Sequence, residues 1–332
     1  MARLVPTLTT DIPVSPATPR SDIQRLVVEK HEFAAPTQPV KNRIAFIFSH
    51  ANGFHKEMLH PLMKLTIESF RKQSQYNQTQ FDFYAFDARN HGDSARLNEA
   101  TVHIPTFSWY DHAMDTIQVI EELELKENYN KVIGVGHSFG GSAMILAEFM
   151  FPKTFDGLCI PEPVISKVIA PYLLREQSPP IKGALKRRDE WKSREDCFKA
   201  FDGRPFWRDL HPDVLQNYIN YGMYDTPEGT VKLKCPKLEE HLVYMAGIYG
   251  SAGAFGSLRS LSIPVHIIHA KDSTFTDPDT AEEIKAQSPM LTNAMVEGSH
   301  MVPGENPAIL VPEIEMLTAR VLAREGGLRA HL

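Results

Sequence analysis

Residues 131–150, KVIGVGHSFGGSAMILAEFM, decide the fold of this chain. Residues 131–135 form a short apolar run typical of a buried strand, and residues 139–150 are rich in small and apolar residues typical of a packed helix. The pattern Gly-x-Ser-x-Gly lies between them, over 136–140. A sharp turn of this kind between strand and helix presents its serine at the carboxyl edge of a sheet. We therefore predict that Ser138 is a nucleophile.

Strands and helices alternate on both sides of this stretch. Short apolar runs that end in polar loops predict strands at 26–28, 43–48, 81–86, 155–160, 263–268 and 291–296. Apolar residues at helical spacing predict helices at 56–74, 109–124, 277–286 and 306–324. Runs that are apolar throughout suit strands covered on both faces. The alternation predicts an α/β fold with a mostly parallel sheet flanked by helices.

The alternation is interrupted over residues 165–262, which are charged and aromatic, have helix-like stretches at 183–201 and 212–221, and show no clear buried strand. A sheet that is interrupted and then completed indicates one catalytic domain with an insertion. We therefore predict an extended N-terminal arm at 1–22, an α/β core from 23–164 and 263–332, and an inserted, mainly helical cap or lid at 165–262.

A serine nucleophile needs a histidine base and an acid that orients the base. In this kind of fold the chain order is serine, acid, histidine, and His300 lies in the loop after the last predicted strand. Two acids follow predicted strands: Asp272, after the strand at 263–268, and Glu162, after the strand at 155–160. We favour Asp272 and keep Glu162 as the alternative acid.

An oxyanion hole needs two positioned hydrogen-bond donors. One predicted donor is the backbone N–H of Phe139, the residue after the nucleophile. The other is predicted in the loop after the strand at 43–48, at Asn52, with a register that is uncertain by one residue. No metal ion or organic cofactor is implied by this set of residues.

Composition and charge narrow the classes of partner. The 332 residues carry a net charge of −6 and contain no basic stripe, which argues against nucleic acid and anionic membrane as partners. The three cysteines, Cys159, Cys197 and Cys235, form no CxxC pair, so neither a disulfide framework nor a zinc ribbon is indicated. No signal peptide and no run of roughly 20 apolar residues is present, which predicts a soluble intracellular protein without a transmembrane segment.

The order of the motifs resembles the α/β-hydrolase superfamily along nearly the whole chain. The motifs that carry the resemblance are His50-Ala51-Asn52-Gly53-Phe54, Asp87-x-Arg89-x-His91-Gly92, Gly136-His137-Ser138-x-Gly140, Asp272 and Gly298-Ser299-His300. Residues 186–236 look like a narrower fungal and bacterial group, which includes a yeast peroxisomal lipase and toxin-biosynthesis esterases. Two departures are His50-Ala51, where many members have His-Gly, and a serine nucleophile, where epoxide hydrolases and haloalkane dehalogenases use aspartate.

The resemblance implies a lipase-like or carboxylesterase-like serine hydrolase that acts on a small ester or thioester with an apolar acyl group. An acyl-CoA thioesterase of the peroxisome is an alternative. A secondary-metabolite cyclase, C–C bond hydrolase or lyase could use the same triad, and a non-catalytic ligand receptor could keep the fold.

The last three residues, Ala330, His331 and Leu332, are a variant of the SKL-type peroxisomal address. They predict the peroxisomal import receptor as a partner and the peroxisomal matrix as the location. Without a functional address the protein would be cytoplasmic.

Overall fold

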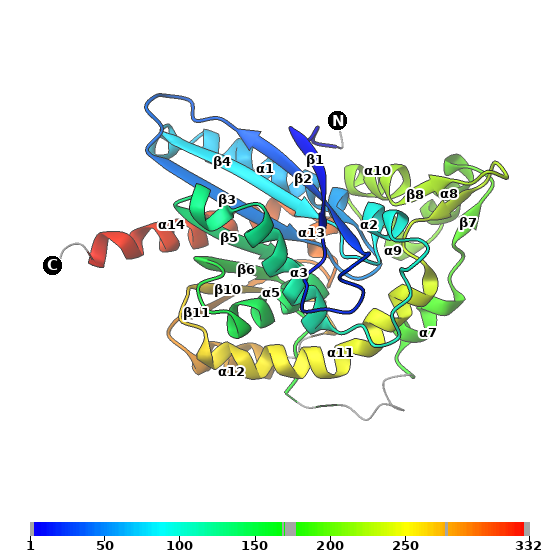
Figure 1. Ribbon diagram of the computed structural model, residues 1–332. Helices are drawn as coiled ribbons and strands as arrows, with labels where there is room; N and C mark the ends of the chain where they lie inside the picture. The colour runs from blue at the N-terminus through cyan, green and yellow to red at the C-terminus, as the bar shows by residue number, and fades with distance from the viewer. Residues whose placement is uncertain (1–2, 168, 170–176, 276–277, 329–332) are drawn as a thin grey trace.

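The computed structural model describes residues 3–167, 169, 177–275 and 278–328 (Figure 1). Within these residues one sheet has eight strands in the order β1-β2-β4-β3-β5-β6-β10-β11. The strands are β1 (Leu8–Pro13), β2 (Arg25–Phe33), β3 (Asn42–Ser49), β4 (Thr79–Phe86), β5 (Lys131–Gly136), β6 (Gly157–Pro161), β10 (Val265–Ala270) and β11 (Leu291–Val296). The pairs from β4 to β11 are parallel, whereas β1 and β2 are antiparallel to their neighbours. The predicted α/β fold with a mostly parallel sheet is confirmed.

Helices cover both faces of the sheet (Figure 1). One face packs against α1 (His60–Arg71) and α14 (Val311–Leu328), and the other against α3 (Trp109–Glu122), α5 (Phe139–Met150) and α12 (Pro278–Gln287). Along β3, Phe46 and Phe48 enter the first of these cores and Ala45 and Ile47 enter the second. Since side chains alternate between the faces of a strand, a strand buried on both sides must be apolar throughout. This arrangement explains the unbroken apolar run.

Shorter elements connect these layers. They are the 3₁₀ turns η1 (Lys56–Leu59), η2 (Ser74–Tyr76), η3 (Leu258–Ser260) and η4 (Pro307–Leu310), and the short helices α2 (Gly92–Leu97), α4 (Leu125–Asn128) and α13 (Val302–Glu305). The helix predicted at 56–74 is divided between Leu59 and His60, where η1 ends and α1 begins. Pro61, the second residue of α1, is tolerated because an N–H in the first turn has no partner within the helix.

The N-terminal segment contributes more than the predicted arm. Within residues 1–22, β1 forms an antiparallel ladder with β2, in which Asp11 lies opposite Val27. Ile12 and Val14 are buried in the core on the α3 and α5 face of the sheet. This part of the segment is therefore an edge strand of the sheet.

The insertion between β6 and β10 contains helices and a small second sheet. The elements are α7 (Pro179–Lys186), α8 (Arg194–Asp202), α9 (Pro205–Arg208), α10 (Pro212–Tyr221) and α11 (Lys237–Ser257), with β7 (Glu190–Trp191), β8 (Met223–Asp225) and β9 (Val231–Leu233). The three strands form a sheet in the order β7-β9-β8, which the sequence did not indicate. Strands of two or three residues are too short to give a periodic signal.

The insertion is built around a core of its own. Phe201 stacks on Trp207 with ring centroids 4.1 Å apart, and Trp191 and Tyr218 are buried in the same cluster. Helix α11 packs against α5 and α7, which places the insertion over the helix that follows Ser138 (Figure 1).

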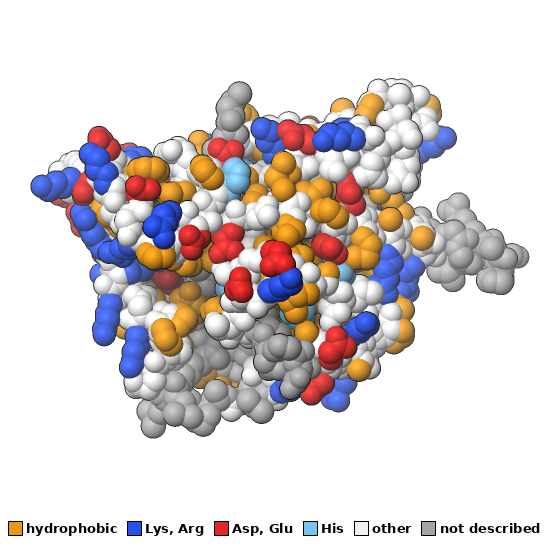
Figure 2. All heavy atoms as spheres, turned by 180° about the vertical axis from the view of Figure 1, so that it is seen from behind, with side chains coloured by type: hydrophobic (Ala, Val, Ile, Leu, Met, Phe, Trp, Pro, Cys, Tyr) orange, Lys and Arg blue, Asp and Glu red, His pale blue; other side chains and the backbone are white. Residues whose placement is uncertain are grey.

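The surface is mixed in character. Figure 2 shows acidic and basic side chains interspersed on the face seen from behind, with apolar side chains between them. None of the helices in the described part of the chain combines the length and apolar character needed to span a bilayer.

Candidate active site

Ser138 occupies a strained turn between β5 and α5. Its backbone has φ 55° and ψ −122°, in the left-handed half of conformational space that residues with a Cβ rarely adopt. Such strain persists only where the surroundings over-determine it. Close packing supplies that constraint, because a Cβ on Gly136 would lie 2.6 Å from the Cα of Gly141 and one on Gly140 would lie 2.4 Å from the Ser49 hydroxyl. The turn therefore requires glycine at the positions that the sequence pattern specifies.

His300 is hydrogen-bonded to Ser138. Its Nε2 is 2.9 Å from the Ser138 Oγ, although the two residues are far apart in the chain. The backbone carbonyl of His300 accepts a hydrogen bond of 2.8 Å from Nε2 of His137, and Phe275 stacks on the imidazole at 3.9 Å between centroids. Burial lowers the pKa of His137 to about 3, so this neighbour remains neutral and does not repel a charge that develops on His300.

The acid in contact with His300 is Glu162. Its Oε2 lies 3.0 Å from Nδ1 of His300, and the residue follows β6 directly. The carboxylate is fully buried and is held by two further donors: the N–H of Ala270, at 2.6 Å from Oε1, and the hydroxyl of Ser273. These bonds hold the carboxylate in place beside Nδ1 of His300.

The structure thus brings the alternative acid, Glu162, and not the favoured Asp272 into contact with His300. Asp272 is exposed, its backbone N–H donates to the carbonyl of Gly298 at 3.0 Å, and no hydrogen bond joins its carboxylate to His300 within the described residues. Strand order does not separate the two acids, because β10 neighbours β11, and the loop after β11 carries His300. The difference lies in the side chains: Asp272 is exposed, whereas Glu162 is buried and directed at Nδ1 of His300.

The predicted oxyanion donors flank Ser138. Phe139 is the first residue of α5, where an N–H has no acceptor within the helix. Asn52 lines the same cavity as Ser138, and its side-chain amide donates to the carbonyl of Glu240 at 2.9 Å. The N–H of Gly53 donates to Nε2 of His91 at 2.9 Å, so this N–H is not available to bind an oxyanion. The loop therefore leaves Asn52 or the residue before it as the second donor.

Buried histidines and carboxylates brace this loop. His50 accepts from the N–H of Ala88 at 3.1 Å, and burial lowers the pKa of His50 to about 4. Asp87 accepts from the N–H of Lys56 and from the N–H of Asp93, each at 2.8 Å. These contacts give the Asp87 segment a structural role beside the site.

A cavity of about 520 Å³ opens beside Ser138. Its lining includes Ser138, His300 and Asn52 from the core, Phe275 from the loop after β10, and Pro180, Gly183, Ala184, Arg187, Phe206, Glu240 and Tyr244 from the insertion. Arg187 donates to the hydroxyl of Tyr218 at 2.7 Å and pairs with Glu240. The cavity therefore has apolar walls, and its polar part contains the Arg187–Glu240 ion pair, whose charges offset each other.

Three comparisons place the chain among known proteins. The model of the alpha/beta hydrolase family matches residues 46–313, and the chain belongs to this family. The type I acyl-CoA thioesterase mpaH of Penicillium roqueforti is 28% identical over 232 residues, which make up 64% of this chain and 51% of that protein. The chain thus spans about half the length of the mpaH relatives that it matches.

The yeast relative is covered more fully. The peroxisomal membrane protein LPX1 of Saccharomyces cerevisiae is 23% identical over 82% of this chain and 74% of that protein. The solved structure of the yeast peroxisomal alpha-beta-hydrolase Lpx1 matches with a TM-score of 0.81 and 21% identity, over 95% of this chain and 89% of that chain. E-2-(acetamidomethylene)succinate hydrolase matches with a TM-score of 0.68 and 17% identity, over 94% and 100%. The resemblance that the motifs predicted is confirmed at the level of family and fold.

Proposed function

We propose that the chain is a serine hydrolase that cleaves a carboxylic ester through an acyl-enzyme. The observation that carries this proposal is the continuous relay from Ser138 Oγ to His300 Nε2, at 2.9 Å, and from His300 Nδ1 to Glu162 Oε2, at 3.0 Å. A serine within reach of a base that is itself oriented by an acid is the arrangement of a nucleophilic triad.

The reaction would follow from these contacts. His300 Nε2 takes the proton of the Ser138 hydroxyl as the oxygen attacks the substrate carbonyl carbon. The N–H groups of Phe139 and Asn52 stabilise the resulting oxyanion. His300 then gives the proton to the leaving alcohol or thiol, and the acyl group stays on Ser138. Attack by water, with His300 again as base, releases the acid and restores the serine.

The cavity supports an apolar acyl group as the part of the substrate that lies beside Ser138. Phe206, Phe275 and Ala184 contribute apolar walls to it. A pocket lined in this way binds hydrocarbon by removing it from water, at about 0.8 kcal/mol for each methylene group. The insertion supplies much of this wall, which supports its proposed role as a cap at 165–262.

An acyl-CoA thioester is the second candidate substrate, and the mpaH relatives favour it because they are named as type I acyl-CoA thioesterases. The basic run Lys186-Arg187-Arg188 in the insertion does not by itself favour a CoA phosphate as ligand. Arg187 is tied to Glu240 and Tyr218, and Arg188 pairs with Asp196 at 2.8 Å. The site chemistry serves both ester and thioester.

Matched ester and thioester series test the proposed function. We expect turnover of p-nitrophenyl esters from acetate to palmitate, and its loss in Ser138→Ala. Faster turnover of the matching acyl-CoA series would favour the thioesterase. Absence of turnover in both series would contradict the hydrolase proposal and favour a cyclase, a lyase or a receptor.

We also propose the peroxisome as the location. The candidate address, Ala330 to Leu332, lies outside the described residues, so the support comes from the peroxisomal yeast relative. A fluorescent protein fused to the N-terminus should colocalise with a peroxisomal marker and should become cytoplasmic when the last three residues are removed. Unchanged location after the removal would contradict the role of the import receptor.

A further inference from the structure

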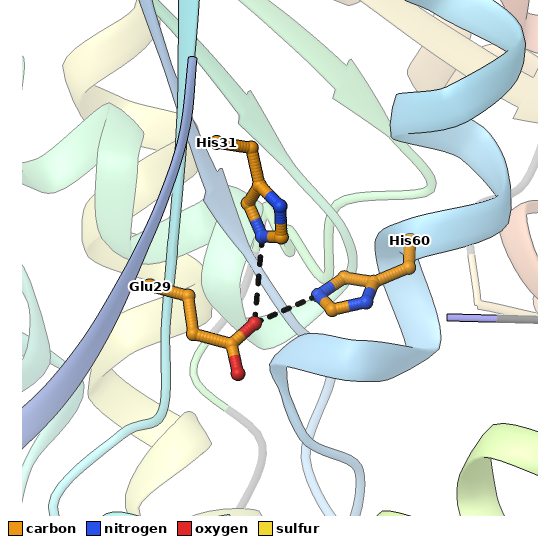
Figure 3. Close-up of side chains that lie close together, drawn as sticks. All are labelled: Glu29, His31 and His60. Carbon is orange, nitrogen blue, oxygen red and sulfur yellow. Dashed lines mark ion pairs between the residues drawn. The ribbon is translucent and has the colours of Figure 1, made fainter. Parts of the chain in front are cut away.

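Two histidines and a glutamate meet in the interior, apart from the triad (Figure 3). Glu29 and His31 are two residues apart on β2 and so lie on the same face of the strand, and His60 is the first residue of α1. Their exposed fractions are 1%, 2% and 0%. Histidine and carboxylate side chains together, fully removed from solvent, are the donor types that transition metals bind in proteins.

The facing atoms of this group converge on one point. Nε2 of His60 and Nε2 of His31 lie 3.1 Å and 3.4 Å from the same carboxylate oxygen, Oε2 of Glu29 (Figure 3). One ligand atom from each of the three residues lies within 4.8 Å of the others. The two imidazole rings are nearly perpendicular, at 79°.

The three facing atoms are ion-paired with one another but are poorly aligned for hydrogen bonds. Oε2 of Glu29 and the ring nitrogens of His31 and His60 form no hydrogen bond of good geometry among the described residues. A buried polar atom without a partner costs about 1–3 kcal/mol, and such atoms are rare in folded proteins. Several of them pointing to one place therefore indicate that something else binds there.

The separations suit a tetrahedral ion. Zinc lies about 2.0–2.1 Å from nitrogen and oxygen ligands, which places two ligand atoms of a tetrahedron about 3.3 Å apart. The two distances to Glu29 Oε2, 3.1 Å and 3.4 Å, fit this edge. Two histidines, one glutamate and one water form a known zinc coordination set.

The surroundings complement a cation. Arg3 binds the other glutamate oxygen, Oε1, at 2.6 Å, which leaves Oε2 directed at the two imidazoles and supplies an outer partner for the ligating carboxylate. The Lys56 ammonium is 4.0 Å from Oε1 but is neutralised by closer contacts to other carboxylates. Those contacts are Glu57 at 2.9 Å, Asp87 at 2.9 Å and Asp93 at 2.6 Å. With Lys234 on Asp93, four carboxylates face three cationic side chains, an excess of negative charge.

We propose that Glu29, His31 and His60 bind a divalent first-row transition metal, with zinc as the ion tested, and that this ion links β2 to the start of α1. Two histidines, one glutamate and one water hold zinc in catalytic sites of other proteins, but the burial of all three ligands here leaves no access for a substrate, so the role is structural. Nδ1 of each histidine has no acceptor in the described structure. A hydrogen bond from this nitrogen to an acceptor outside the site changes metal affinity by about 10–100-fold. We therefore expect weaker metal binding here than at a site whose histidines have such acceptors.

Metal content measures this site without reference to enzyme activity. Tag-free protein is stripped with a chelator, incubated with zinc, separated from free metal and examined by elemental mass spectrometry. We expect about one zinc per chain, a higher unfolding temperature with zinc than without it, and a cobalt derivative with the visible absorption of a tetrahedral ion. The double variant His31→Gln/His60→Gln should lose the metal and the zinc-dependent rise.

His266→Gln is the matched control. His266 is also buried and is also paired with a glutamate, Glu313, at 2.8 Å. Among the described residues, however, no third potential metal ligand lies close enough to complete a site with this pair. This variant should bind zinc as the wild type does. Zinc retained at wild-type stoichiometry by the double variant would overturn the proposal. If the double variant does not fold, the unmodified chain decides, because absence of both zinc and the tetrahedral cobalt spectrum overturns it too.

Discussion

Replacement of Glu162 by glutamine tests which acid orients His300. The change keeps the shape of the side chain and removes its charge. In the wild type, Oε1 accepts from the N–H of Ala270 at 2.6 Å, and Oε2 accepts from Ser273 and faces Nδ1 of His300 at 3.0 Å. The glutamine oxygen should take the Oε1 position, because an amide NH₂ there would oppose the N–H of Ala270. The NH₂ group then faces His300.

This orientation forces the wrong tautomer on the base. An NH₂ group donates to Nδ1 of His300, which places the ring proton on Nε2, where it opposes the hydroxyl of Ser138. Replacement of a triad acid by its amide lowers kcat by about 10⁴-fold through this effect. At 1.36 kcal/mol for each factor of ten, the loss corresponds to about 5.4 kcal/mol of transition-state stabilisation.

Initial rates on the best p-nitrophenyl ester give the required comparison. Asp272→Asn is the control, because this carboxylate is exposed and unbonded to His300, and we expect a change of less than about threefold. Urea unfolding of both variants checks that each is folded. A large loss in Asp272→Asn together with near-normal rates in Glu162→Gln would refute the reasoning and return Asp272 to the triad.

Three further predictions concern the stability of the protein and the acyl chain length of its substrate. Burial lowers the pKa of His50 from 6.5 to about 4 and of His137 from 6.5 to about 3, so the unfolded chain takes up these protons first as the pH falls. The free energy of unfolding should therefore fall between pH 6.5 and about pH 4, by roughly 3 kcal/mol for His50 alone. Urea titrations in which the free energy of unfolding does not decrease between about pH 7 and pH 5 would contradict this. Gly141→Ala places a Cβ 2.4 Å from the Gly136 carbonyl oxygen and should destabilise by about 1–3 kcal/mol in urea, whereas Gly256→Ala, which meets nothing within 4 Å, should not. Gly183→Leu adds a side chain to the cavity wall at a position where no atom lies within 4 Å of the added Cβ. It should lower kcat/KM for long-chain esters by about fourfold for each methylene group that no longer fits, and should leave the acetate ester unaffected. An equal loss for all esters would exclude the cavity as the acyl site.

Local features of the sequence were sufficient for most of the core fold. The strand, turn and helix around Ser138 are consecutive in the chain, and their residue types specify one geometry that the structure reproduces. His300 could be placed because it follows the last predicted strand. The same locality applies to Pro61, which lies in the first turn of α1, where proline is tolerated.

Features that depend on spatial neighbours could not be predicted in this way. The choice between Glu162 and Asp272 rests on which carboxylate is directed at His300, and the direction of a side chain in the loop after a strand leaves no periodic signal. The cap sheet was missed because its strands have two or three residues. The group of Glu29, His31 and His60 joins two segments whose proximity follows only from the packing of α1 beside the sheet.

Mapping a covalent probe onto the chain tests the central claim most directly. A fluorophosphonate reacts with an activated serine, and peptide mass spectrometry identifies the labelled residue. We predict a single adduct on Ser138, lost in Ser138→Ala and retained in Ser142→Ala, whose hydroxyl is bonded to the carbonyl of Val164 at 2.9 Å instead. Labelling that persists in Ser138→Ala, or a folded wild type that takes up no probe, would contradict the assignment of Ser138 as the nucleophile.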